Sequence, residues 1–306
     1  MPRSNTDNIS LCKEGMFSVQ DWRTEDNKHL RDVMYNRFKN QVSLLLESKK
    51  PKAFHSTKGR LDPRRAYRSP FSDNIFLQTT KVPNGDTTIV MLIDGSGSMD
   101  CGVEVFGKGY TRIGVCNAIV SAFSKAVNDV LGNEIKIEVF LKSAPSYHGK
   151  AITGTDNGSF VTLTRVFSNS NKNLDFDKIL KLDCVSPIKR GGSNDGSYTA
   201  EYAVLPALLK WMNKNIVTKN VVLFNLTDGD AYCSLGSNNM SFNDEENKQM
   251  RIKYLRNVPN ATMSIGGRSN HNHMTNVYGQ NVIECDDDGF HVKMFNTFMT
   301  FIGEAL

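Results

Sequence analysis

The stretch Thr87-Thr88-Ile89-Val90-Met91-Leu92-Ile93-Asp94-Gly95-Ser96-Gly97-Ser98-Met99 decides the fold of this 306-residue chain. Its first seven residues are mostly apolar and β-branched, do not alternate, and lead to glycines, which is typical of a strand buried on both faces of a parallel sheet. Open α/β sheets bind ligands at the carboxyl ends of such strands. There the chain places one carboxylate and two hydroxyls within five residues, which indicates a candidate site.

Similar segments follow along the chain. Further buried strands are predicted at 219–226 and 261–265, a short strand at 281–284, and two antiparallel neighbours at a sheet edge at 135–141 and 160–167. Three- and four-residue apolar spacing predicts helices at 24–47, 111–131, 174–182, 198–214, 242–257 and 290–305. We therefore expect an α/β fold with a doubly wound, mostly parallel, Rossmann-like sheet, one antiparallel edge strand and helices on both faces.

The N-terminal part differs from the rest in charge. Residues 1–68 hold 15 Lys and Arg against 8 Asp and Glu, whereas the remainder holds 22 against 24. The helix at 24–47 has an apolar face that must pack on something. We therefore divide the chain into a helical, basic extension at 1–82, packed on the main domain, and a main domain at 83–306.

Within this extension, residues 49–55 are interpreted as a polar linker, 59–65 as a turn that starts a short helix, and 74–81 as a strand or extended lead-in. The basic excess peaks at 49–68. A solvated surface is the leading interpretation and an acidic partner the second. Nucleic acid is the weakest, because no aromatic residues interleave with the basic ones.

The composition excludes several classes of protein. Hydrophobic residues make up 39% and charged residues 23%, which is ordinary for a globular protein. No apolar run approaches the ~20 residues that span a bilayer, and the first five residues lack a signal-peptide core, so we expect a cytoplasmic protein without a membrane partner. The six cysteines form no C-x-x-C pair, which argues against a zinc cluster and a disulfide scaffold.

Three loops, each after a predicted strand or before a predicted helix, contain side-chain oxygens that could bind a metal. None of these loops supplies a histidine. The candidate metal ligands are Asp94, Ser96, Ser98, Ser193 and Asp228, with Asp195 as the alternative to Ser193 in the middle loop. Two carboxylates at neighbouring strand ends repel unless a cation neutralises them, and hydroxyls or water complete an octahedron around Mg²⁺. We expect Mg²⁺, with Mn²⁺ or Ca²⁺ as alternatives, and an open position that an acidic side chain of a client protein occupies.

Other interpretations of the Asp94 loop are weaker. A G-x-G-x-x-G loop needs glycine where Asp100 stands, and the Gly-Lys-Ser/Thr of a Walker loop is absent from this stretch. A nucleophile elbow needs glycine two residues before its serine, where Asp94 precedes Ser96. The bland alternative is that the serines cap the next element and Asp94 accepts backbone hydrogen bonds. No catalytic or cofactor-binding residue is assigned, and enzymatic activity is left open.

Two smaller features also have two interpretations each. Residues 104–110 follow the Asp94 loop as a Gly-rich insertion, either a mobile lip over the site or a plain surface loop. The run 286–288 consists of three aspartates before the last predicted helix. It caps that helix favourably against the dipole, or it forms an acidic patch that faces a partner.

The motifs resemble a known family. Asp94-Gly-Ser-Gly-Ser-Met, with Asp228 in Leu-Thr-Asp-Gly, resembles the metal-ion-dependent adhesion site (MIDAS) of von Willebrand factor A (VWA) domains. Ser193 stands where many members carry threonine. Three further stretches are similar to the C-terminal half of the cobaltochelatase subunit CobT: Gly59-Arg-Leu-Asp-Pro-Arg-Arg, Asn194-Asp-Gly, and Ser264-Ile-Gly-Gly-Arg-Ser-Asn-His with Tyr278. This compact, CobT-like chain is similar to copies encoded in large bacteriophage genomes.

This resemblance implies a function. CobT works with an AAA+ ATPase ring of the MoxR or CobS kind, so the resemblance implies an AAA+ ATPase partner. The leading hypothesis is a Mg²⁺-dependent adaptor that couples such a motor to a client, in the bacterial cytoplasm or, for a viral chain, the host cytoplasm. The alternative is a true subunit of an ATP-dependent cobalt or magnesium chelatase in tetrapyrrole (cobalamin) biosynthesis.

Overall fold

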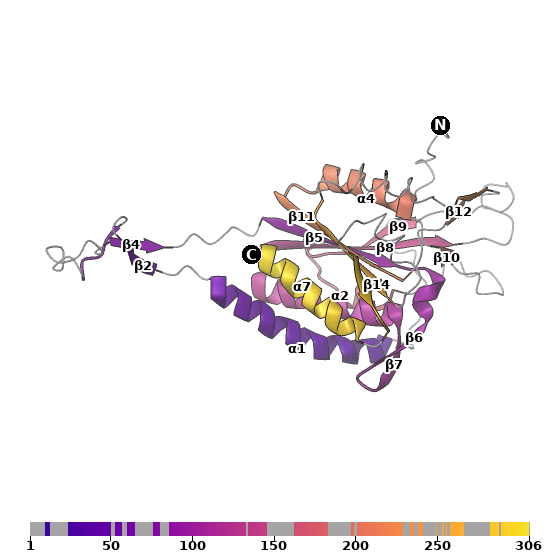
Figure 1. The fold of residues 1–306 in the computed structure, drawn as a ribbon, viewed down its shortest axis with the longest axis horizontal. Helices are drawn as coiled ribbons and strands as arrows, with labels where there is room; N and C mark the ends of the chain where they lie inside the picture. The colour runs from indigo at the N-terminus through magenta and orange to yellow at the C-terminus, as the bar shows by residue number, and fades with distance from the viewer. Residues whose placement is uncertain are drawn as a thin grey trace.

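A single large sheet forms the centre of the fold (Figure 1). The computed structural model describes residues 10–12, 24–49, 53–56, 60–64, 76–79, 86–132, 134–145, 162–182, 197–198, 201–228, 233–235, 238–240, 249, 253, 255, 258–265, 282–287 and 289–305. In spatial order the strands are β1 (Ser10–Cys12), β9 (Thr162–Ser168), β8 (Ile135–Pro145), β5 (Thr87–Asp94), β11 (Asn220–Thr227), β14 (Asn260–Ile265) and β15 (Val282–Cys285), and β10 (Ser197–Tyr198) pairs with β8.

The pairing of these strands confirms the predicted fold class. β5 runs parallel to β8 on one side and to β11 on the other, and β14 and β15 continue the parallel order. β9 is antiparallel to β8, as expected from the sequence. Outside β9 lies β1, which pairs with it in parallel and was not predicted. The carboxyl ends of β5, β8 and β11 therefore meet at one edge of the sheet.

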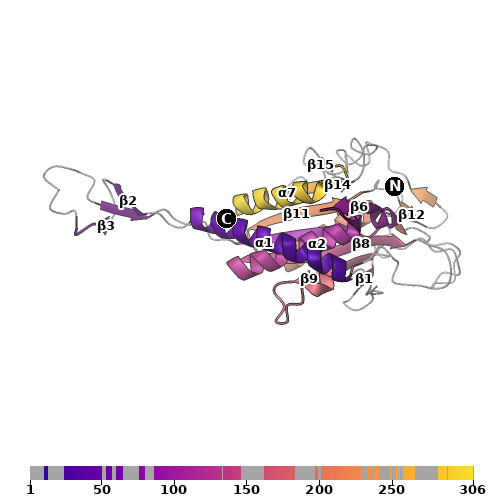
Figure 2. The ribbon, with the colours of Figure 1, turned by 90° about the horizontal axis from the view of Figure 1, so that it is seen from below.

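Helices cover both faces of the sheet (Figures 1 and 2). On one face lie α1 (Thr24–Lys49), α2 (Arg112–Leu131) and α7 (Phe290–Ala305), and on the other lies α4 (Glu201–Asn215). The unbroken apolar run of β5 fits this arrangement. Ile89, Met91 and Ile93 belong to the core beneath α1, α2 and α7, whereas Val90 and Leu92 belong to the core beneath α4. The short α3 (Asp177–Leu180) contacts α2.

The N-terminal helix α1 is part of the main core. Its residues Leu30, Met34, Phe38 and Val42 are buried in the same cluster as α2 and α7. Where α1 meets α2, a Cβ at Gly114 would lie 2.8 Å from the side-chain oxygen of Asn27, so a larger residue there would force that side chain to shift. The packing expected for this helix is thus observed, whereas the boundary at residue 82 stays a prediction.

A small sheet follows α1, where the sequence suggested a polar linker. Strands β2 (Ala53–Ser56) and β3 (Arg60–Leu61) both pair antiparallel with β4 (Phe76–Thr79). The prediction of a polar linker reaching residue 55 was therefore wrong, since β2 occupies residues 53–56. The turn expected at 59–65 is present at Pro63 and Arg64, and the helix expected after it lies outside the described residues. The strand or extended lead-in expected at 74–81 is confirmed as β4. Figures 1 and 2 show these strands lying apart from the main sheet and its helices.

Two elements connect β5 to α2. The first is a 3₁₀ turn, η4 (Gly97–Asp100), and the second is a hairpin of β6 (Gly102–Val105) and β7 (Lys108–Thr111). The hairpin turns through Phe106 and Gly107, which both have positive φ angles of 53° and 73°. The insertion after the Asp94 loop is thus a paired β-hairpin.

The remaining described elements add little to the site. A separate hairpin is formed by β12 (Cys233–Leu235) and β13 (Asn238–Met240). The helix expected at 242–257 lies mostly outside the described residues. Among the helices that the structure describes, none combines the length and the apolar character needed to cross a membrane.

Candidate functional site

Asp94 is the last residue of β5 and is fully buried at the carboxyl edge of the sheet. One carboxylate oxygen, Oδ1, accepts a 2.8 Å hydrogen bond from the backbone N–H of Ser96. The other, Oδ2, accepts a hydrogen bond from the hydroxyl of Thr227 at the end of β11. Asp94 is therefore held from its own loop and from the neighbouring strand.

Gly95 lets the loop leave β5 beside β8. Its backbone N–H donates a 2.8 Å hydrogen bond to the carbonyl oxygen of Lys142. A Cβ at this position would lie 3.1 Å from that oxygen and 3.2 Å from a methyl carbon of Leu141. A side chain at this position would therefore crowd β8, so glycine suits the close approach of the loop to that strand.

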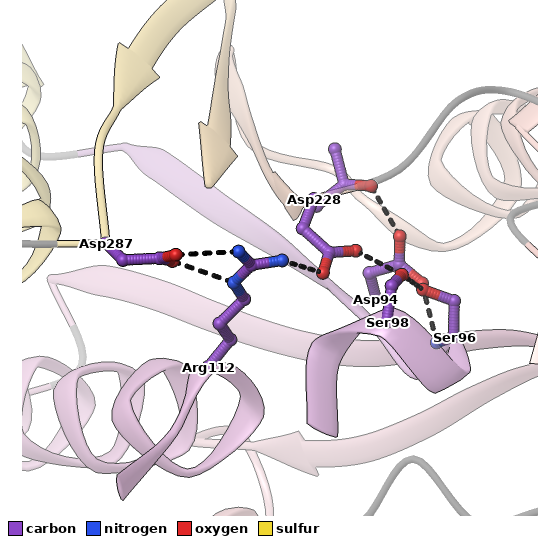
Figure 3. Close-up of polar contacts among 7 residues, drawn as sticks. Asp94, Ser96, Ser98, Arg112, Asp228 and Asp287 are labelled. Atoms are coloured by element: carbon purple, nitrogen blue, oxygen red, sulfur yellow. Dashed lines mark hydrogen bonds and ion pairs between the residues drawn. The ribbon is translucent and has the colours of Figure 1, made fainter. Parts of the chain in front are cut away.

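A cluster of side-chain oxygens follows Gly95 (Figure 3). The hydroxyl oxygens of Ser96 and Ser98 are 3.1 Å apart, and the Ser98 hydroxyl donates a 2.7 Å hydrogen bond to Oδ1 of Asp228. Ser96 precedes η4 but makes no side-chain capping hydrogen bond to it. Ser96 and Asp228 are buried, whereas Ser98 is exposed. The cluster therefore opens to solvent on the side of Ser98.

The spacing of these oxygens fits a hard divalent cation. Mg²⁺–O bonds of about 2.1 Å at right angles place neighbouring ligand oxygens about 3.0 Å apart. The two separations in the cluster, 3.1 Å and 2.7 Å, bracket this value. Among the described residues no group of three or more His, Cys, Asp or Glu side chains could hold a metal. A metal here would depend on the serine hydroxyls as well as on carboxylates.

Arg112 holds the far side of Asp228 (Figure 3). Its Nη1 donates a 2.8 Å hydrogen bond to Oδ2 of Asp228, while Nε and Nη2 each donate a 2.8 Å bond to Asp287. Arg112 is the first residue of α2, after the N-cap Thr111. The arginine thus connects the end of β11 with the segment just before α7, and it fixes the orientation of the Asp228 carboxylate.

Lys142 is the second cation at the site. It pairs with Asp94 across β8 and β5 in the strand register, its side chain is 1% exposed, and its Nζ lies 3.7 Å from Oδ2 of Asp94. Each of the two site carboxylates therefore faces a cation from the chain itself: Asp94 faces Lys142, and Asp228 faces Arg112.

Burial shifts the proton affinity of these groups. Desolvation, and then the negative charge of Asp94, raise the pKa of Asp228, although the bonds from Ser98 and Arg112 oppose the shift. Desolvation lowers the pKa of Lys142 to about 8, against the attraction of Asp94. Both shifts have the same origin, since burial disfavours the charged form of each group. A cation bound at the site would favour the ionised form of Asp228.

The structure brings together four of the five predicted ligands: Asp94, Ser96, Ser98 and Asp228. Ser193 and its alternative Asp195 lie outside the described residues. The described residue nearest to them along the chain is Ser197, which pairs with Pro145 at the carboxyl end of β8. The alternative in which Asp94 accepts backbone hydrogen bonds and the serines cap the next element is supported in part. Asp94 accepts a backbone hydrogen bond, but the Ser96 side chain does not cap η4.

The sequence did not predict that Arg112 and Lys142 lie at the site, or that Asp287 pairs with Arg112. A signal for Arg112 existed, because a cation in the first turn of a helix is unfavourable for the dipole and therefore indicates an anionic partner. Asp287 was expected to cap α7 or to face a partner, and the structure instead shows it paired with Arg112. The predicted strand at 135–141 ends one residue before Lys142. No local sequence pattern indicates that this lysine is buried.

Comparisons with known proteins identify no family for this chain. No protein-family model matches it, and no curated protein matches it. Among solved structures it is similar to proximal thread matrix protein 1 (PTMP1) from the mussel byssus, with 12% sequence identity and a TM-score of 0.41. The match covers 83% of this chain and 48% of the mussel protein, so the chain spans about half of that protein's length. At this identity and TM-score, the likeness supports no conclusion about fold or function.

Proposed function

We propose that this chain is a Mg²⁺-dependent protein-binding adaptor of the VWA type, similar to cobaltochelatase CobT, that works with an AAA+ ATPase on a client protein. One observation carries the proposal. At the carboxyl edge of the sheet, the Ser98 hydroxyl oxygen lies 3.1 Å from that of Ser96 and 2.7 Å from Oδ1 of Asp228. This is where the sequence placed a MIDAS-like motif, and where open α/β sheets bind ligands.

The residues would divide the work of holding the ion. The hydroxyls of Ser96 and Ser98 are suited to direct coordination, with Asp94 and Asp228 supplying negative charge directly or through water. Ser193 or Asp195 would contribute the middle-loop ligand. When bound, the ion offers a coordination position to an acidic side chain of a client. Mn²⁺ and Ca²⁺ have the same preference for oxygen and are alternatives to Mg²⁺.

The chain's own residues prepare the cluster for this use. Thr227 and the Ser96 backbone orient Asp94, while Arg112 orients Asp228. Because Ser98 is exposed, a partner approaching this edge can reach the cluster without moving the buried strands. A chelatase subunit in tetrapyrrole biosynthesis remains the alternative, and it depends on the sequence resemblance alone.

Capture of partners with and without the ion tests the proposal. Immobilised wild-type chain is exposed to cell extract in Mg²⁺ or in excess EDTA, and the captured proteins are identified by mass spectrometry. We expect an AAA+ ATPase, or a client, that is captured in Mg²⁺ and lost in EDTA. Asp94→Ala and Ser98→Ala should lose the same proteins while keeping the wild-type circular dichroism spectrum.

Asp86→Ala is the matched control, because Asp86 is exposed immediately before the opposite end of β5. It should capture partners as the wild type does. Capture that persists in EDTA, or in a folded Asp94→Ala chain, would contradict the proposed function. Insertion of metal into a corrin by the purified chain with its ATPase would instead favour the chelatase alternative.

A further inference from the structure

Lys142 is an unusual residue to find at the carboxyl edge of this sheet. Lysine side chains are rarely buried unless they are paired, yet Lys142 is 1% exposed and directly follows the apolar residues of β8. Its ammonium lies 3.7 Å from Oδ2 of Asp94, the same oxygen that accepts the Thr227 hydrogen bond. Its position is fixed by the strand register, in which Lys142 is directly opposite Asp94.

Arg112, the other cation at the site, contacts a different carboxylate from Lys142. Arg112 donates one hydrogen bond to Asp228 and two to Asp287, so its charge is divided between two carboxylates. Lys142 lies beside Asp94 at the base of the oxygen cluster, and its charge is also attracted by Asp228. Its charge therefore bears directly on how much negative potential Asp94 presents toward Ser96 and Ser98.

We propose that Lys142 is the residue that sets the ion affinity of this site, by compensating Asp94 with a charge from the chain itself. This inference rests on the proposed function, since it assumes that the Ser96–Ser98–Asp228 cluster holds a divalent cation. A buried ammonium beside Asp94 repels a cation bound there and weakens its binding. The consequence is a site that binds Mg²⁺ reversibly and does not need the ion in order to fold.

The expected effect is large enough to measure. Charges a few ångströms apart in a buried site interact strongly, because the effective dielectric constant there is about 20 rather than about 80. Removal of the Lys142 charge should therefore tighten Mg²⁺ binding by roughly tenfold to a hundredfold. The same change should increase the thermal stabilisation that Mg²⁺ gives, since stabilisation grows with the ratio of ion concentration to Kd.

Isothermal titration with MgCl₂ at neutral pH tests the inference on wild type, Lys142→Met and Lys142→Gln. The glutamine variant keeps a hydrogen-bond donor but removes the charge. Lys136→Met is the matched control, because Lys136 is an exposed lysine on the same strand and its loss changes the net charge equally. We expect both Lys142 variants to bind Mg²⁺ at least about tenfold more tightly than the wild type, and Lys136→Met to match the wild type.

The outcomes separate this inference from the proposed function. If the wild type binds Mg²⁺ and the folded Lys142 variants bind it no more tightly, the inference fails while the proposed function stands. If neither wild type nor variants bind Mg²⁺, both fail. A Lys142 variant that unfolds without the ion should refold in saturating Mg²⁺, because the ion then compensates Asp94. If both variants stay unfolded in Mg²⁺, that result also overturns the inference.

Discussion

Replacing Arg112 with lysine tests whether the arginine fork fixes Asp228. Arg112 makes three hydrogen bonds of 2.8 Å, one to Asp228 and two to Asp287. A lysine keeps the charge and has three donors but lacks the planar fork, so it cannot reproduce all three bonds in their present geometry. The Asp228 side chain is fully buried, whereas that of Asp287 is 39% exposed, so the contact with Asp228 dominates the expected loss.

The magnitude follows from these exposures. A hydrogen bond to a buried charged group contributes about 1.5–3 kcal/mol, and an exposed ion pair contributes up to about 1 kcal/mol. Arg112→Lys should therefore lower the free energy of unfolding by about 2 kcal/mol. Arg112→Met leaves a buried carboxylate without its cation and should cost about 3–5 kcal/mol. Adding Asp228→Asn to Arg112→Met should recover part of that loss, because the carboxylate then left without Arg112 is that of Asp287, which is 39% exposed.

Equilibrium unfolding in urea, with EDTA present, measures these differences without any contribution from bound ions. Arg31→Met is the matched control, because the Arg31 side chain is as buried as that of Arg112, but its partners Asp32 and Asp177 are 61% and 42% exposed. It should cost less than about 1 kcal/mol. An Arg112→Met variant within about 0.5 kcal/mol of wild type would refute the reasoning, because surface substitutions without special contacts fall in that range.

Three further predictions concern other parts of the fold. Burial of His291, and then the nearby Arg37, lower its pKa below 6.5. The folded state therefore binds fewer protons than the unfolded chain, and stability falls as the pH drops from about 7 to about 5. His291→Gln should flatten this loss and His29→Gln, at an exposed position, should not; equal pH slopes in urea melts would contradict the assignment. Gly132 has φ 59° and ψ −128°, so Gly132→Ala should lower the free energy of unfolding by about 1–3 kcal/mol. Gly303→Ala inside α7, where a Cβ meets nothing within 4 Å, should raise it by about 0.5–1 kcal/mol. The opposite order of stability in thermal melts would count against these backbone assignments. Phe38→Ala should cost about 3–5 kcal/mol, because the side chain is fully buried against α2 and α7; a loss under about 1 kcal/mol would mean that α1 is not part of the core.

The sequence was informative where one physical signal dominated. The apolar run of β5 predicted burial on both faces, and consecutive residues such as Met91 and Leu92 pack into opposite cores. The last helix was predicted at 290–305, and α7 has those bounds. In both cases the pattern depends on residues that are close in the chain, so a single sequence contains the information.

The small sheet was missed because strand pairing is not local. β2 and β3 have four and two residues, and both are completed by β4, which follows β3 by more than ten residues. Such short strands lack a period of their own, and tertiary context overrides their weak intrinsic preference. The sequence therefore indicated a linker where the structure has β2, and it predicted a strand or extended lead-in at β4 without the strands that pair with it.

The candidate site was predictable in its oxygens and not in its cations. Asp94, Ser96 and Ser98 form a motif within five residues, and Asp228 follows a second strand of the same kind. Lys142 reaches the site through the register of β8 with β5, and Arg112 through its position at the start of α2. A local sequence pattern contains neither piece of information. The candidate ligands were predicted from a local motif, whereas the two cations beside them were seen only in the structure.

The most direct test of the account is to locate the ion. A crystal of the wild-type chain grown with Mn²⁺, recorded at a wavelength where manganese scatters anomalously, should show one peak within about 2.2 Å of the hydroxyl oxygens of Ser96 and Ser98. The same crystals should reveal whether Ser193 or Asp195 completes the coordination. Absence of a peak beside the two serines at saturating Mn²⁺, or a peak only elsewhere in the molecule, would contradict the central claim that this edge of the sheet holds a divalent cation.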